Sequence, residues 1–155
     1  MVRALAGILA CVPIALSAAQ PGLPRATDLA LDGAAMRAAK MPMVVLYSQA
    51  QCSYCDQART YLVPMADDPA NARRALFRQI DIDSDAALSD FAGKATTHRE
   101  LARQLGARLT PTVSVLDSEG RVLSEPIIGM RLVDFYGQYV DNAIDQARAA
   151  LAGRP

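Results

Sequence analysis

The chain has 155 residues with 16 basic and 16 acidic side chains, so its formal net charge at neutral pH is zero. That length suits a single domain with a hydrophobic core, and the balanced charge offers no basic surplus for nucleic acid. We therefore expect one globular domain and no nucleic-acid partner.

The N-terminal segment 1–19 has the three parts of a secretory signal peptide. Arg3 supplies a positive charge, residues 4–16 are almost uncharged and apolar, and residues 17–19 are small, which favours cleavage before Gln20. We therefore predict that the chain is exported. The abundance of Arg and Ala favours a bacterial periplasm as its destination.

Two other roles for this segment are less well supported by its composition. A membrane anchor is disfavoured because the apolar run is short for spanning a bilayer and contains Pro13. Lipoprotein anchoring at Cys11 is a minor alternative, because Leu9 fits a lipobox poorly and the apolar run continues past the cysteine.

Residues 20–27 contain two prolines and a glycine and are predicted to form a flexible leader before a domain at 28–152. Beyond it, apolar periodicity predicts alternating helices and strands. This order predicts an α/β fold, in which a central mixed sheet of about four strands carries helices on both faces. The expected elements are a helix at 29–40, a strand at 43–47, a helix at 56–65, a strand at 76–82, a loop or irregular insertion at 84–96, a helix at 97–106, a hairpin at 110–128 and a helix at 132–151.

Local signals support several of these elements. Pro42 is expected to end the first helix. Thr97 and Glu100 have the spacing of a capping box, in which Thr97 caps the helix and Glu100 reaches back to it. Tyr47 and Phe77 lie in strand patterns and are expected in the core.

The most informative pattern is Cys52-Ser53-Tyr54-Cys55, which stands between the first strand and the second helix. The unpaired N–H groups of a helix start stabilise a thiolate, and the thiolate is the form that attacks a disulfide. We predict that Cys52 is the nucleophile and that Cys55, one turn deeper, is the resolving thiol.

Cysteine usage favours redox activity for this pair. Removal of segment 1–19 would leave only Cys52 and Cys55 of the 3 cysteines. A purely structural disulfide is the weaker interpretation, because structural disulfides in secreted chains usually close longer loops.

The strand–CxxC–helix unit, Thr110-Pro111 at the start of the hairpin, and Gly129 before the last helix together resemble the thioredoxin superfamily. The resemblance covers roughly residues 43–151. It implies a cis peptide bond before Pro111, although an ordinary trans proline at a strand start is the alternative. It also implies substrate binding at Ser53, Tyr54, Thr110 and Pro111, where an extended substrate would pair with the backbone of Thr110.

Within the superfamily, two segments resemble periplasmic thioredoxin-like proteins of the SoxW type: residues 48–55 and residues 90–103. This resemblance implies a thiol-disulfide reductase that acts on protein or small-molecule disulfides without a cofactor. Its expected partners are a membrane electron donor or another thioredoxin-like protein, and the expected state is a monomer. Tyr54 with Thr110 also resembles bacterial disulfide isomerases, but their separate dimerisation domain would not fit a chain of this length.

The chain departs from the family at three positions, one of which is Ser53, where relatives commonly have Pro. Gln51 replaces the Trp that usually precedes the first cysteine, and Leu46 replaces a buried Asp of cytosolic thioredoxins. The proton acceptor for Cys55 therefore stays unassigned, as do the redox potential and the direction of electron flow. Asp56 has opposing effects, since it favours the helix dipole but disfavours a nearby thiolate.

The main alternative function is a copper or zinc carrier that uses the same two thiols. A structural zinc site needs four ligands, but the one histidine, His98, lies in another element and is expected to cap or solvate its helix. Met65 or Met130 could add a soft ligand for Cu(I), although both are more simply core residues. The sequence therefore predicts no metal site.

Overall fold

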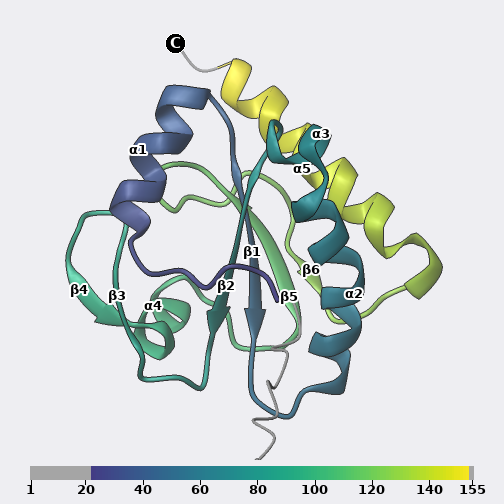
Figure 1. Cartoon of the computed structure of the whole chain (residues 1–155), viewed down its shortest axis with the longest axis horizontal. Coiled ribbons are helices and arrows are strands. Elements are labelled where there is room, and N and C mark those ends of the chain that lie inside the picture. Colours follow the sequence, from purple (N-terminus) through teal and green to yellow (C-terminus); the bar gives the residue numbers. More distant parts are fainter. Residues whose placement is uncertain (1–21, 154–155) are drawn as a thin grey trace, which may run out of the picture.

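The computed structural model, which describes residues 22–153, has a four-stranded mixed sheet covered by helices on both faces (Figure 1). The strand order is β2-β1-β5-β6. The central strand β1 is parallel to β2 and antiparallel to β5, and β5 is antiparallel to β6. The predicted fold class is confirmed, whereas the predicted signal peptide and Cys11 lie outside the described residues. The strands of this sheet are β1 (Met43–Ser48), β2 (Leu76–Asp81), β5 (Thr112–Leu116) and β6 (Ile127–Ile128).

The helices follow the predicted order with two short additions, α3 and the 3₁₀-helix η1. Within residues 22–153, no helix is both long enough and apolar enough to cross a membrane. The helices are α1 (Leu29–Ala39), α2 (Ser53–Asp67), α3 (Pro69–Ala72), α4 (His98–Gln104), η1 (Val133–Phe135) and α5 (Tyr136–Ala152).

The sheet separates two hydrophobic cores. Alternate residues of β1 point to opposite faces, so Val44 and Leu46 pack in the core that contains α2 and α5. Val45 and Tyr47 pack in the other core, beneath α1 and α4. Every residue of β1 is buried, because helices cover both faces of the sheet.

The structure differs from the sequence prediction at the leader. Residues 20–27 were predicted to be flexible, but Leu23 and Ala26 are buried. The Ala26 N–H donates to the Gln79 carbonyl at 2.9 Å, and the Gln79 N–H donates to the Pro24 carbonyl at 2.9 Å. The segment from Leu23 to Ala26 therefore lies along the edge of β2 and belongs to the domain.

Two further elements differ from the prediction. The expected loop at 84–96 contains a hairpin of β3 (Ala87–Ser89) and β4 (Ala95–Thr97). The second half of the predicted 110–128 hairpin is mostly irregular, because only Ile127 and Ile128 pair as a strand with β5.

The cap of α4 is half of the predicted capping box. The Thr97 side chain accepts the Glu100 N–H at 3.2 Å, which confirms Thr97 as the cap. The Glu100 carboxylate instead accepts bonds from Arg103 and Gln104 at 2.9 and 3.0 Å. Glu100 therefore stabilises the helix surface rather than its first backbone N–H.

Candidate active site

The two cysteines of the CxxC pattern form a disulfide at the start of α2, with their Cα atoms 5.1 Å apart. Cys52 is the N-cap of the helix, and its sulfur accepts the Cys55 N–H at 3.1 Å. Cys52 is partly exposed, whereas Cys55 is fully buried. A substrate would therefore reach Cys52 first, and the helix start supplies a donor to its sulfur.

The turn that carries the disulfide follows directly from the end of β1. Gln51 has a φ of 54°, a left-handed conformation that reverses the chain into α2. The Ala50 N–H donates to the Asp83 carboxylate at 2.9 Å, which ties this turn to the loop after β2. The end of the sheet thus fixes the position of Cys52.

The structure brings Thr110 and Pro111 to the disulfide. The Thr110 hydroxyl lies 3.8 Å from the Cys52 sulfur, and the peptide bond between Thr110 and Pro111 is cis. The Pro111 carbonyl accepts the Gly129 N–H at 2.8 Å, so Gly129 also lies beside this segment. Three segments that are distant in the sequence therefore meet at one end of the sheet.

The two residues between the cysteines are both exposed. Tyr54 has 64% of its surface accessible, and Ser53 is also on the surface of the first turn of α2. Neither of them contributes to the hydrophobic cores. Their side chains are therefore available to a partner that approaches Cys52.

Arg59 is a site residue that the sequence analysis missed. Its guanidinium donates to the Asp56 carboxylate at 2.6 Å, to the Ser48 hydroxyl at 2.8 Å and to the Gln79 side chain at 3.2 Å. Arg59 follows Cys55 by one helical turn, so helix periodicity was the signal that could have identified it. Its charge offsets that of Asp56 beside the cysteines.

A polar recess of about 500 Å³ lies next to this turn. Asp81 borders it and accepts hydrogen bonds from Arg25 and from the Gln79 amide, the latter at 2.6 Å.

Leu46, in the middle of β1, is fully buried and apolar. The structure therefore has no buried carboxylate at position 46 of β1, where cytosolic thioredoxins carry an Asp.

His98 differs from its predicted role at the helix surface, because it is buried with 2% of its surface accessible. Its Nδ1 atom accepts the Asp81 N–H at 3.1 Å. Desolvation lowers the pKa of His98 from 6.5, against an opposing effect of Asp81. The imidazole therefore joins α4 to β2 in its neutral form.

The predicted soft ligands for copper, Met65 and Met130, contribute to the hydrophobic packing. Met65 and Met130 are partly buried and pack against the core between α2, α5 and the sheet. Across residues 22–153, no three His, Cys, Asp or Glu side chains gather in a group that could hold a metal ion.

Comparison with known proteins agrees with this arrangement. The family model described as a thioredoxin-like domain matches residues 29–130, which include the disulfide and the Thr110–Pro111 segment. The chain belongs to the thioredoxin-like domain family. A search of curated proteins found no significant match.

Solved thioredoxin-fold structures resemble the chain at low sequence identity. Thioredoxin NaTrxh from Nicotiana alata is 16% identical with a TM-score of 0.54, and the match covers 82% of this chain and 97% of that protein. A thioredoxin from Thermus thermophilus is 19% identical with a TM-score of 0.53, covering 82% of this chain and 92% of that one. The oxidised C-terminal domain of DsbD from Neisseria meningitidis is 20% identical with a TM-score of 0.51, covering 77% and 98%.

Family membership and the disulfide at the helix start together define the activity class. The protein is a thiol-disulfide oxidoreductase of the thioredoxin-like family. The Cys52–Cys55 pair, which forms a disulfide at the start of α2, is the candidate reactive centre.

Proposed function

We propose that the protein is a periplasmic reductase of protein or small-molecule disulfides, similar to the SoxW type. The observation that carries this proposal is the unequal exposure of the two sulfurs. Cys52 is accessible and accepts a helix N–H, whereas Cys55 is buried behind it. This arrangement suits one thiol for attack on a substrate and the other for release of the product.

The reaction begins with the reduced pair. The Cys52 thiolate attacks one sulfur of the substrate disulfide, and the second substrate sulfur leaves as a thiolate that takes a proton. Cys55 then loses its proton and attacks the Cys52 sulfur, which releases the remaining substrate thiolate. Two electrons thereby pass to the substrate, the Cys52–Cys55 disulfide forms, and a dithiol donor must reduce it again.

The backbone beside Cys52 supports binding of an extended substrate. Thr110 lies outside the helices and strands, and its main-chain groups form no backbone hydrogen bond to another described residue. A substrate segment could therefore pair with Thr110 as an added strand. Leu109 and Tyr54 are 62% and 64% exposed, so each could contact apolar residues of that segment.

Cysteine variants test the assignment of the two thiols. Reduced protein should reduce 5,5′-dithiobis(2-nitrobenzoate), and Cys52→Ser should abolish turnover. Cys55→Ser should retain the first attack and accumulate a mixed disulfide detectable by mass spectrometry, since the resolving thiol is gone. Full turnover by Cys52→Ser would overturn the assignment.

The direction of electron flow needs a separate measurement. Equilibration of the Cys52–Cys55 pair with a glutathione series gives its reduction potential. A reductase should have a potential near that of thioredoxin, about −270 mV, rather than near the DsbA value of about −120 mV. A strongly oxidising potential would contradict the reductase proposal and leave the oxidoreductase class intact.

Export is tested at the N-terminus. The proposal expects the protein in the periplasmic fraction of a bacterial host, with a mature chain that begins at Gln20. N-terminal sequencing of that fraction checks the site. Metabolic labelling with palmitate at Cys11 would instead indicate a lipoprotein.

A further inference from the structure

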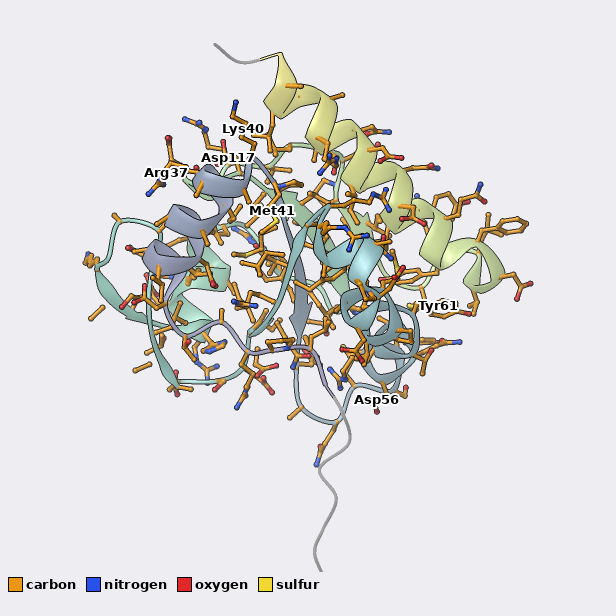
Figure 2. All side chains as sticks on the ribbon, turned by 45° about the horizontal axis from the view of Figure 1, so that its top comes forward. Arg37, Lys40, Met41, Asp56, Tyr61 and Asp117 are labelled. Atoms are coloured by element: carbon orange, nitrogen blue, oxygen red, sulfur yellow. A yellow bond between two sulfur atoms is a disulfide. The ribbon has the colours of Figure 1, made fainter. Side chains whose placement is uncertain are left out.

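A second cavity, the far-end pocket, lies at the opposite end of the molecule from the disulfide. It has a volume of about 570 Å³ and lies between the last turn of α1, the turn after β5 and the last turns of α5. Figure 2 shows Arg37, Lys40 and Asp117 together at this end, whereas Asp56 beside the cysteines lies at the other. The six residues of β1 separate the two ends by about 20 Å.

The walls of the far-end pocket carry four cationic side chains, from Arg37, Lys40, Arg121 and Arg148. Arg121 is paired with the carboxylates of Asp117 at 2.7 Å and Glu119 at 2.6 Å. Among residues 22–153, Arg37, Lys40 and Arg148 form no ion pair. The pocket lining therefore carries four cations and one carboxylate, that of Asp117.

The hydrogen bonds of these three cations leave most of their donors free for a ligand. Arg37 reaches only the Ser118 carbonyl, at 3.5 Å, and Arg148 donates to the Arg74 carbonyl at 3.2 Å. A cation near one helix C-terminus is explained by the helix dipole alone. Here, however, Arg37 and Lys40 of α1 and Arg148 of α5 border the same cavity.

The rest of the lining consists of the polar residues Asp117 and Ser118 and four apolar residues. Met36 is 1% exposed, and Met41, Leu151 and Ala152 complete the apolar wall between α1 and α5. Pockets of 300 to 1,000 Å³ with mostly apolar walls and a few placed polar groups are typical of small-molecule sites. The far-end pocket has a volume in this range, one apolar wall and a cationic rim.

Close packing fixes the shape of one wall. Gly33 of α1 lies against the turn after β5, so that a Cβ atom at this position would be 2.7 Å from the Ser118 carbonyl oxygen. The Asp117 carboxylate accepts the N–H groups of Glu119 and Arg121, both at 2.9 Å. The turn is therefore held in place before any ligand arrives.

We propose that the far-end pocket binds a small organic anion, a molecule with a phosphate or carboxylate head and an apolar body. The head group lies against Arg37, Lys40 and Arg148, and the apolar body lies against Met41 and Leu151. This site is independent of disulfide reduction at Cys52.

Calorimetric titration with phenyl phosphate, inorganic phosphate and benzyl alcohol tests this proposal. Phenyl phosphate should bind in a 1:1 complex and more tightly than inorganic phosphate, while benzyl alcohol should not bind. Arg37→Gln with Lys40→Gln should weaken binding of phenyl phosphate about tenfold, or about 1.4 kcal/mol, as expected for two exposed charge pairs. Phenylacetate, titrated in parallel, shows whether a phosphate or a carboxylate head is preferred.

The matched control is Arg73→Gln with Lys94→Gln, which removes the same charge from exposed positions outside the pocket. This control should bind phenyl phosphate as the wild type does, and the Arg37 and Lys40 variant should retain disulfide reduction. Amide chemical shifts should change around residues 36–41 and 148–152. No binding, an equal loss in both double variants, or shift changes confined to another surface would overturn the proposal.

Discussion

The hydroxyl of Thr110 lies 3.8 Å from the sulfur of Cys52, although 58 residues separate them in the sequence. The contact connects the segment before β5 to the first turn of α2. A hydroxyl can donate to a thiolate but has less effect on a neutral thiol, so this neighbour favours the charged form of Cys52. The reactivity of Cys52 therefore depends on two chain segments.

Thr110→Val should raise the pKa of the Cys52 thiol in the reduced protein, because the thiolate loses a donor while the side-chain volume is kept. We expect an increase of about half a pKa unit, which is about 0.7 kcal/mol. The rate of alkylation by iodoacetamide as a function of pH measures this shift. Thr60→Val, on the exposed face of α2, serves as the control and should leave the pKa unchanged.

Arg59→Met should also raise the pKa of the Cys52 thiol, because the Asp56 carboxylate then lacks its partner at 2.6 Å. If Arg59 acts through Asp56, the double variant Arg59→Met with Asp56→Asn should restore the wild-type value. Alkylation rates of the reduced proteins at several pH values test both. A double variant with the same raised pKa as Arg59→Met would show that Arg59 acts on the thiolate directly.

The stability of the fold should decrease as the pH falls below about 6.5, because His98 is the one histidine of the chain and is buried in its neutral form. Desolvation lowers the pKa of His98 from 6.5 in the folded protein. As the pH falls below 6.5, the unfolded chain therefore binds a proton before the folded chain does. The stability that is present above pH 6.5 is then lost progressively until the pH reaches the pKa of His98 in the folded protein. Urea unfolding at about pH 7.5 and pH 5.5 measures the difference.

His98→Asn keeps an acceptor for the Asp81 N–H and removes the titrating group. The variant should be less stable than the wild type at high pH, but its stability should change less between the two pH values. The same pH dependence in both proteins would show that His98 is not the group responsible.

Tyr136→Phe should raise the free energy of unfolding by about 1 kcal/mol, because the hydroxyl of Tyr136 is buried and has no hydrogen-bond partner among residues 22–153. Burial also raises its pKa to about 12, so the proton stays on the phenol at neutral pH. The ring contact with Tyr61, at 5.6 Å between centroids, is retained. Thermal unfolding of the wild type and both variants measures the effect. The control Tyr139→Phe alters a more exposed ring and should leave the stability unchanged. A loss of stability in Tyr136→Phe would show that the Tyr136 hydroxyl has a hydrogen-bond partner.

The local part of the site was predictable from sequence. The apolar run at Met43, the CxxC pattern and the helix that follows are adjacent in the chain, so their periodicity is sufficient to order them. The resemblance to thioredoxins added the neighbourhood of Thr110 and Pro111, which no local pattern could place beside Cys52. Local periodicity also predicted the order of the helices and strands. It predicted the buried face of α5, which contains Tyr136, Val140 and Ile144.

Two of the missed features depend on contacts between distant residues, and a third on the shortness of two strands. The leader was predicted to be flexible from its prolines, but Gln79 provides two of the backbone hydrogen bonds that hold it, and the Ser89 N–H provides another to Thr27. The sequence pattern predicted His98 at the surface of its helix. In the structure the side chain is buried, where its Nδ1 atom accepts the N–H of Asp81 in β2. The strands β3 and β4 contain three residues each, too few for an alternating pattern to be distinguished from a loop.

The packed segment from Pro24 to Ala26 has a consequence for association between chains. It pairs with β2 at Gln79 and thereby covers part of an edge that would otherwise present free N–H and carbonyl groups. Uncovered edges of this kind are templates for pairing with another molecule. A chain shortened to begin after Ala26 should therefore self-associate through β2, even where its disulfide still forms.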